Sequence, residues 1–315
     1  MRAPVVVPER VHHKAVALGA AGDRWLADVG QIVADLEREW NIEVGNTIEG
    51  GSGAFVARAV TGDGQPAVLK VSIPDGLEGH SPFAEELHML ELADGRGYVR
   101  LLRSDIDRRA MLQEQLGRSL AVLDLPVEAQ IDIIAATLAS AWWRPPPDPV
   151  LRTGRAQAAS LRRSIRLDWA RLGRPCAERT LERAEQCASA RESAFDAATA
   201  VLIHGDAHPA NVLEDPNTRG HFKLIDPDGM ISEPAHDLAI PLRDWTTELL
   251  AAPDPVALGR NWCARLGHDA GVDVEAIWEW AFVERVSTGL FLLRLGEPLG
   301  ARLLEIAELW TDAAP

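Results

Sequence analysis

Residues 204–211 read His204-Gly205-Asp206-Ala207-His208-Pro209-Ala210-Asn211. An apolar run at residues 201–203 leads into this stretch, and Val212 and Leu213 lead out of it. A second segment follows at residues 222–228 and reads Phe222-Lys223-Leu224-Ile225-Asp226-Pro227-Asp228. Both segments pair a short strand-like run with polar loop residues. An Asp, an Asn five residues later and a further Asp at a strand end therefore mark one part of the chain.

This order of side chains has a chemical meaning. Nucleotide phosphates are strongly negative, and Mg²⁺ accompanies them with hard oxygen ligands such as carboxylates. Protein kinases use a catalytic Asp, a metal-binding Asn five residues later and a metal-binding Asp further along. Any one of these residues alone indicates only an ordinary surface loop. Together they predict phosphoryl transfer, with Asp206 as the catalytic base and with Asn211 and Asp226 as Mg²⁺ ligands.

The N-terminal third carries a pattern typical of nucleotide binding. Gly51, Ser52 and Gly53 lie in a glycine-rich loop that leads into a strand-like segment at residues 54–60. A turn separates it from a second predicted strand at residues 67–73, which contains Lys70. In kinases such a loop covers the nucleotide phosphates, and a strand Lys reaches the α- and β-phosphates. The loop alone is as well explained by a plain turn, and Lys70 strengthens the nucleotide interpretation.

A kinase Lys needs a helix carboxylate to hold it. Ser81 and Pro82 favour a helix start, and Glu86 on that helix is the expected partner, with Glu85 as the reserve. The alternative is a solvated acidic first turn that the helix dipole favours.

Two more strands are expected at residues 98–102 and 110–116. The second would end at a hinge, where the Gln113 C=O and the Gln115 N–H could bind adenine. A plain strand end remains the alternative for both groups.

The rest of the pattern is mostly helical. A helix is predicted over residues 23–40, and helices dominate from residue 125 onward. The proline-rich residues 145–149 must interrupt a helix. We therefore predict an α+β, two-lobed protein-kinase-like fold. Residues 1–116 would form a small β-rich N-terminal nucleotide-binding lobe, and residues 117–315 a larger helical C-terminal lobe with the catalytic loop and acceptor site.

The amino-acid composition limits the classes of partner that this protein is expected to bind. The chain has 315 residues, with 32 Lys and Arg against 47 Asp and Glu, a net charge of −15. Such a charge disfavours nucleic acid as a partner and suits a cationic small molecule. Three cysteines with no metal-binding spacing indicate a reducing compartment. Neither a signal peptide nor an apolar run of about 18 residues is present, so we expect a cytoplasmic protein without a membrane partner.

These motifs together resemble the aminoglycoside phosphotransferases, most closely their streptomycin 6-phosphotransferase and hydroxyurea phosphotransferase branch. The segments that carry the resemblance span residues 25–310 and include residues 99–102, 112–120, 204–213 and 225–228. It implies ATP and Mg²⁺ as cofactors and antibiotic resistance as a role. It also implies that His204 and Asp237 brace the catalytic loop. Two departures stand out: Ala207 replaces a common Leu, and Trp142 begins a segment whose sequence differs from the family pattern near the acceptor pocket.

The acceptor is the open question. An aminoglycoside such as streptomycin is the first hypothesis, and hydroxyurea, choline, homoserine, a sugar or another antibiotic are alternatives. A non-catalytic pseudokinase that binds nucleotide is a further alternative, which the intact motif disfavours. Acidic residues after the motif could place a cationic acceptor, although solvated helix faces or core packing explain them better: Glu233, Asp244, Glu248, Glu279 and Glu284.

Overall fold

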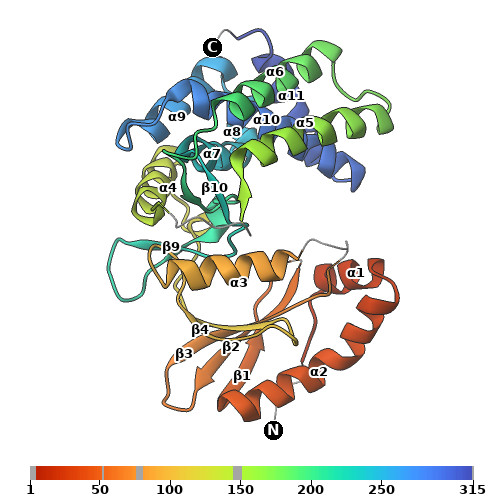
Figure 1. Cartoon of the computed structure of the whole chain (residues 1–315), viewed down its shortest axis with the longest axis vertical. Helices are drawn as coiled ribbons and strands as arrows, with labels where there is room; N and C mark the ends of the chain where they lie inside the picture. The colour runs from red at the N-terminus through yellow and green to blue at the C-terminus, as the bar shows by residue number, and fades with distance from the viewer. Residues whose placement is uncertain (1–4, 52, 76–80, 145–150, 314–315) are drawn as a thin grey trace. The chain divides into compact units, whose positions relative to one another are not determined.

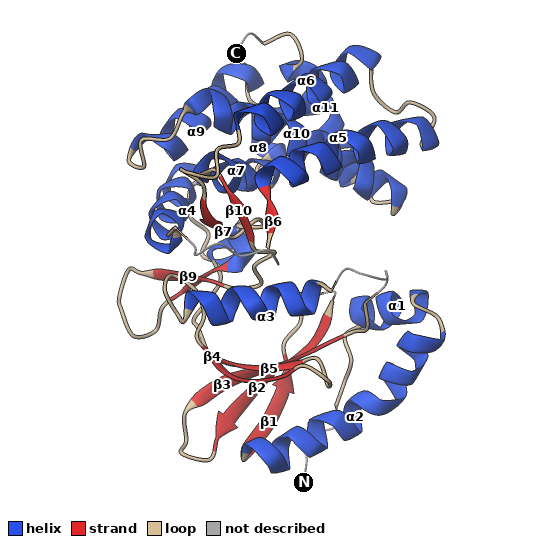
Figure 2. Cartoon of the chain, in the orientation of Figure 1, coloured by secondary structure: helices blue, strands red, loops and turns tan. Residues whose placement is uncertain are grey.

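The computed structural model describes residues 5–51, 53–75, 81–144 and 151–313. The chain separates into two compact units, Met1–Gly117 and Arg118–Pro315. Strands gather in the first unit and helices dominate the second, as Figure 2 shows. This is the α+β segregation of elements that the sequence predicts.

The first unit is built on one antiparallel sheet with the strand order β1-β2-β3-β5-β4. Its strands are β1 Ile42–Thr47, β2 Ala54–Thr61, β3 Pro66–Ser72, β4 Leu101–Asp105 and β5 Ala110–Glu114. β4 and β5 differ slightly from the predicted strands at residues 98–102 and 110–116. Arg109 has a φ of 54°, which closes the turn between them and sets where the ladder starts.

Helices α1 Glu9–Ala17 and α2 Ala20–Trp40 cover one face of this sheet (Figure 1). Trp25, Val29, Val33 and Leu36 of α2 are buried in a shared core with the inward side chains of the sheet. Their spacing of three and four residues is the stripe that predicts a helix over residues 23–40. The short α1 was not expected, since only Val11 and Ala15 are buried in it.

Helix α3 Pro82–Ala93 lies over the other face of the sheet (Figure 1). Ser81 is its N-cap and accepts the backbone N–H of Ala84 at 3.3 Å, and Pro82 follows in the first turn. Leu69 and Val71 of β3 point into the α1–α2 core. Because side chains alternate along a strand, Lys70 points the opposite way, toward α3.

The second unit is organised around one central helix, α10 Val274–Arg294, which packs against α5, α6, α7, α9 and α11. Its middle part is buried on nearly every side, including Trp278 and Trp280, and the helix therefore shows no amphipathic stripe. The other helices are α4 Val127–Ala141, α5 Gly154–Arg171, α6 Glu178–Ala194, α7 Pro234–Ala239, α8 Thr246–Ala251, α9 Pro255–His268 and α11 Leu299–Trp310. The proline-rich residues 145–149 lie outside the described residues.

Short strands and 3-10 turns frame the loops of the second unit. One sheet has the order β6-β10-β7, and β8 pairs with β9 in a hairpin. These elements are β6 Arg152–Thr153, β7 Val201–Ile203, β8 Val212–Glu214, β9 Phe222–Leu224, β10 Met230–Ser232, η1 Leu120–Val122, η2 Pro209–Asn211 and η3 Ile240–Arg243. The motif at residues 204–211 is the connection from β7 to β8.

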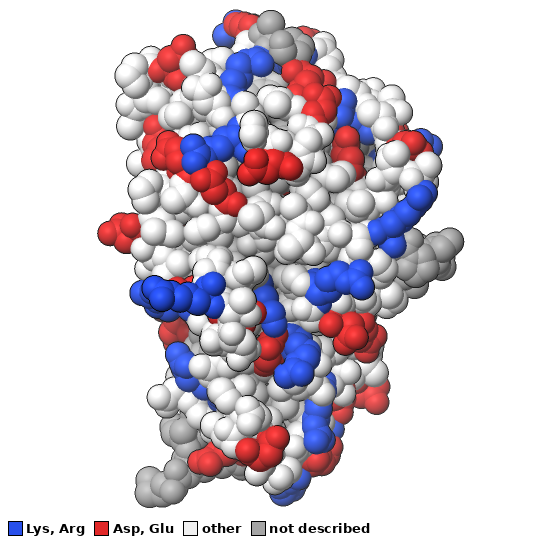
Figure 3. Space-filling model, turned by 90° about the vertical axis from the view of Figure 1, so that its left-hand side faces the viewer, with Lys and Arg blue, Asp and Glu red and all other residues white. Residues whose placement is uncertain are grey.

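Two surface properties bear on partners. Within the described ranges, no helix combines the length and apolar character needed to cross a membrane. On the face drawn in Figure 3, acidic and basic side chains are interspersed in small groups.

Candidate active site

The loop after β7 is anchored by the buried carboxylate of Asp237 on α7. Asp237 Oδ2 accepts the backbone N–H of His204 at 2.9 Å, and Oδ1 accepts that of Gly205 at 2.8 Å. Trp142 Nε1 also donates to Oδ2, at 2.9 Å. Trp142, at a position that departs from the family pattern, thus helps to hold the Asp237 carboxylate that anchors the loop. Three donors satisfy a carboxylate that is fully buried.

His204 joins the two motifs of the sequence. Its ring Nδ1 accepts the backbone N–H of Asp206 at 3.0 Å, and its Nε2 lies 2.8 Å from the Ile225 carbonyl oxygen. Because Nδ1 is the acceptor, the neutral ring carries its proton on Nε2 and donates it to Ile225. His204 therefore shapes the backbone on both sides of the site.

Asp206 and Asn211 are brought together by a hydrogen bond. The Asn211 side chain donates from Nδ2 to the backbone carbonyl of Asp206 at 3.0 Å, and only 7% of Asn211 is exposed. His208 caps the intervening 3-10 turn by accepting the Ala210 N–H at 3.3 Å. The five-residue spacing in the sequence thus becomes one closed loop.

Asp226 follows the strand that pairs with β8. Val212 pairs with Leu224, and the Ile225 N–H donates to the Asn211 carbonyl at 3.0 Å. Asp226 comes next, with a φ of 54° and an exposed side chain. The left-handed backbone at this non-glycine residue turns the chain sharply at the end of the strand.

Asn211 and Asp226 offer donors that fit a divalent cation. The Asn211 Nδ2 is engaged by Asp206, so Oδ1 is the amide atom that can bind metal. Amide and carboxylate oxygens are the ligands that Mg²⁺ prefers, completed by phosphate oxygens and water. In the part of the chain that is described, no group of three or more His, Cys, Asp or Glu could hold a metal by itself.

Arg243, which belongs to no recognisable sequence motif, lies against the predicted base. Its Nη2 donates to Asp206 Oδ1 at 2.5 Å, while His208 Nε2 lies 3.7 Å from Asp206 Oδ2. Burial alone raises the pKa of Asp206, but the charge of Arg243 and its hydrogen bond to the carboxylate outweigh burial, so the pKa is lowered. A lone Arg after α7 carries no motif, so only the tertiary contact reveals it.

Two further carboxylates lie in the electrostatic field of Asp206. Loss of hydration next to the surrounding protein is the main cause that raises the pKa values of Asp228 and Asp244. The negative charge of Asp206 raises both values further. Both residues retain solvent-exposed surface.

Two of the other acidic candidates, Glu233 and Glu279, make contacts inside the protein. Glu233 accepts Trp280 Nε1 at 2.8 Å and pairs with Arg191 at 3.3 Å. Glu279 pairs with Arg191 at 2.6 Å. Both residues therefore contribute to the packing of α6 against α10.

In the first unit, the structure brings Lys70 and Glu86 together. Lys70 Nζ lies 2.7 Å from each Glu86 carboxylate oxygen, and the two side chains are 11% and 10% exposed. A bidentate contact of this kind fixes the Lys70 ammonium in place.

The remaining predicted nucleotide contacts lie along the same sheet. Gly51 and Gly53 belong to the loop between β1 and β2, where Gly53 C=O accepts the Ile73 N–H at 3.0 Å. Ser52 lies outside the described residues. Gln113 is buried in β5, between β3 and β4. The Gln115 N–H makes a long bond of 3.4 Å to the Pro66 carbonyl.

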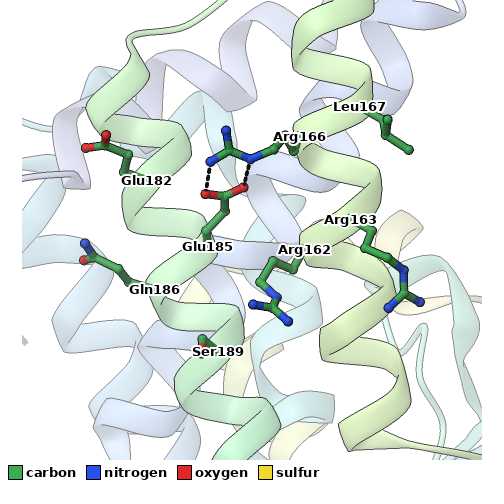
Figure 4. Close-up of a pocket in the computed structure, with 8 residues that line it drawn as sticks. All are labelled: Arg162, Arg163, Arg166, Leu167, Glu182, Glu185, Gln186 and Ser189. Atoms are coloured by element: carbon green, nitrogen blue, oxygen red, sulfur yellow. Dashed lines mark hydrogen bonds and ion pairs between the residues drawn. The ribbon is translucent and has the colours of Figure 1, made fainter.

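A groove of about 940 Å³ lies between α5 and α6 (Figure 4). Its lining includes Arg162, Arg166 and Glu185, and Figure 4 shows Arg166 paired with Glu185. None of the predicted site residues lines it. The groove is thus separate from the loop that holds Asp206.

The chain is similar to known kinases and phosphotransferases. A family described as aminoglycoside/hydroxyurea antibiotic resistance kinase matches residues 39–296. A hydroxyurea phosphotransferase of Kitasatospora aureofaciens is 30% identical over 70% of this chain, and the match spans 62% of that relative. A streptomycin 6-kinase of Streptomyces glaucescens is 26% identical over 88% of this chain and 87% of its own length.

Solved structures show the same fold. The choline kinase LicA of Streptococcus pneumoniae superposes with a TM-score of 0.61 and 15% identity, covering 90% of this chain and 98% of its own. LicA has also been solved in complex with AMP. The predicted protein-kinase-like fold is therefore confirmed. The chain belongs to the aminoglycoside/hydroxyurea antibiotic resistance kinases, a family of small-molecule phosphotransferases.

Proposed function

We propose that this protein transfers the γ-phosphoryl group of ATP to a hydroxyl group of an aminoglycoside such as streptomycin. The observation that carries the proposal is the closed loop in which Asn211 Nδ2 binds the Asp206 carbonyl and Asp237 binds the backbone N–H groups of His204 and Gly205. A loop held at so many points keeps a carboxylate in one place, as in-line transfer requires.

Asp206 would act as the base. Its lowered pKa keeps the carboxylate ionised at neutral pH, so it can orient the acceptor hydroxyl and accept the hydroxyl proton. As that O–H bond breaks, the acceptor oxygen forms a bond to the γ-phosphorus, and ADP leaves with the electrons of the broken P–O bond. His204 and Asp237 keep the loop in shape and take no part in the proton transfer.

Asn211 and Asp226 are the residues that we propose to hold Mg²⁺. When bound, the ion would neutralise charge on the nucleotide phosphates. Asn211 directly precedes β8 and Asp226 follows its partner strand β9, and the Ile225 N–H bond to the Asn211 carbonyl connects the two segments. This link supports a shared role.

The first unit would bind the nucleotide, as part of a nucleotide-binding lobe at residues 1–116. Lys70 would hold the α- and β-phosphates, and Glu86 would fix Lys70 through the 2.7 Å contacts described above. Gly51, Ser52 and Gly53 would cover the phosphates, and the Gln113 C=O and Gln115 N–H would bind adenine. Residues 117–315 would carry the catalytic loop and the acceptor site.

Several observations favour streptomycin as the acceptor. The streptomycin 6-kinase relative matches 88% of this chain, and the net charge is −15. Streptomycin carries guanidinium groups, and the solvent-exposed carboxylates of Asp228 and Asp244 are groups with which a guanidinium would pair. Hydroxyurea is the second candidate, because the hydroxyurea phosphotransferase has the higher identity, 30%. The free thiols support a cytoplasmic setting, where ATP is also present.

The test is an acceptor panel. Purified protein with Mg²⁺ and γ-labelled ATP would be incubated with streptomycin, other aminoglycosides, hydroxyurea, choline, homoserine and simple sugars, and phosphorylated products would be identified by mass spectrometry. We expect transfer to streptomycin in the wild type and its loss in Asp206→Asn. Transfer to hydroxyurea alone would assign the second candidate. Nucleotide binding without transfer to any acceptor would support a pseudokinase and contradict our proposal.

A further inference from the structure

Arg243 holds one oxygen of the predicted catalytic carboxylate. It is the last residue of η3, and its side chain is 18% exposed. Its Nη2 lies 2.5 Å from Asp206 Oδ1, whereas the imidazole Nε2 of His208 lies 3.7 Å from Oδ2. The two oxygens of Asp206 therefore have different surroundings. Oδ1 faces a close guanidinium donor, and Oδ2 is the less engaged atom.

The guanidinium is itself fixed from the other side. Arg243 Nη1 lies 3.3 Å from Thr288 Oγ1 and 3.5 Å from Glu284 Oε2, both on α10. Glu284 Oε1 lies 3.1 Å from His236 Nε2. The His236 ring stacks on Trp280 with centroids 3.7 Å apart and planes 7° from parallel. A continuous set of polar contacts thus runs from the core of the second unit to Asp206.

This arrangement is suited to orienting a carboxylate. The guanidinium is planar, stays charged and presents its donors in a rigid fork, so anchoring one nitrogen restricts the direction of the other. Charge-assisted bonds to a carboxylate are short and strong. A proton cannot be accepted easily at an oxygen that already faces such a donor. The proton of the substrate hydroxyl would therefore be taken up at Asp206 Oδ2.

We propose that Arg243 is a positioning residue that holds Asp206 Oδ1 and leaves Oδ2 directed to the acceptor hydroxyl, with Thr288 and Glu284 as its anchors. The inference rests on the proposed phosphoryl transfer and names how the site orients its base. Arg243 acts through Asp206 and does not itself touch the acceptor.

The test compares Arg243→Gln and Arg243→Lys with the wild type under Mg²⁺ and ATP. For Arg243→Gln we expect kcat to fall about 100-fold, the loss typical of a misplaced reacting group. The KM for ATP should stay within about threefold, since nucleotide binding is untouched. Arg243→Lys should recover part of kcat, and methylguanidinium should restore part of the activity of Arg243→Ala. Arg265→Gln is the matched control, because Arg265 makes a bidentate pair with Asp132 at 2.6 Å on the surface of the same unit.

Thr288→Val serves as a milder variant if the Arg243 variants fail to fold. It removes one anchor of the guanidinium, and we expect kcat to fall several-fold while the melting temperature stays near that of the wild type. Unchanged kcat in whichever of Arg243→Gln and Thr288→Val is folded would overturn the inference. So would a loss confined to the KM for ATP, which would make Arg243 a phosphate-binding residue. If the wild type transfers phosphate to no acceptor, the proposed function fails first and the inference fails with it.

Discussion

The carboxylate of Asp237 accepts the backbone N–H of His204 at 2.9 Å. Its other oxygen accepts the next backbone N–H, that of Gly205, at 2.8 Å. One buried side chain on α7 therefore sets the path of the chain directly before Asp206. This single contact pair connects the stability of the second unit to the geometry of its candidate active site.

Asp237→Asn should destabilise the protein. An amide offers one acceptor oxygen in place of two, so at least one backbone N–H loses its partner inside the core. We expect the free energy of unfolding, measured with urea, to fall by about 2–3 kcal/mol. Asp132→Asn is the control, because its carboxylate is 54% exposed in a surface pair and should change stability by less than about 1 kcal/mol. Equal effects of the two substitutions would argue against the anchor.

Asp206→Asn should remove the base and keep the fold. The substitution preserves shape but not the ability to accept a proton, so kcat should fall by about 10³. ATP affinity, measured by calorimetry, should remain near the wild-type value. Asp254→Asn is a suitable control, since Asp254 caps α9 and Asn caps helices equally well. Substantial residual turnover in Asp206→Asn would mean that another group is the base.

Glu86→Gln should weaken the interaction of the protein with ATP. It removes the negative charge that lies 2.7 Å from Lys70 Nζ, so the ammonium should lose its fixed position. We expect the KM for ATP to rise about tenfold in steady-state kinetics. Glu85→Gln, on the same helix turn, is the control and should have little effect. A larger rise of the KM for ATP in Glu85→Gln than in Glu86→Gln would identify Glu85 as the residue that holds Lys70.

Asp226→Asn should lower the affinity for Mg²⁺ with nucleotide. A neutral amide oxygen binds Mg²⁺ more weakly than a carboxylate, so the Mg²⁺ concentration for half-maximal activity should rise about tenfold or more. Asp215→Asn, in the β8–β9 turn, is the matched control, since its side chain accepts the Asn217 N–H within the turn. An unchanged Mg²⁺ dependence would remove Asp226 from the metal site.

The buried thiols should make the protein less stable in alkali. Burial raises the pKa of Cys187 and of Cys263 to about 12 and that of Cys176 to about 11. An unfolded thiol ionises at about pH 8.5 to 9, so the stability that each buried thiol contributes is complete below that pH. It is lost as the pH rises toward the folded-state pKa.

The loss should reach about 1.4 kcal/mol for each thiol and pH unit in this window. Urea unfolding of the wild type and of Cys187→Ala at pH 8, 9 and 10 would measure it. The stability of Cys187→Ala should fall less steeply with pH. Parallel curves for the two proteins would show that this thiol is not protected in the folded state.

Parts of this structure could be predicted because the relevant information is local. Ser81 and Pro82 mark the start of α3 through capping rules that involve only neighbouring residues, and the stripe from Trp25 to Leu36 defines α2. The strands predicted in the first unit lie within a few residues of β2, β3, β4 and β5, whereas β1 was not predicted. Helix α1 was missed because it is short and buries only two side chains.

The amino-acid sequence by itself determined the order of Asp206, Asn211 and Asp226, the glycine-rich loop before Lys70 and the division into strand-rich and helical parts. These features follow from spacing and local propensity. Only the tertiary structure decided that Arg243 faces Asp206, that Trp142 joins Asp237, and that Glu284 supports Arg243 from α10. Such partners are far apart in the chain, and a charged or aromatic residue in a helix shows no sign of its partner until packing brings the two together. The surroundings of the candidate base are therefore a property of the fold.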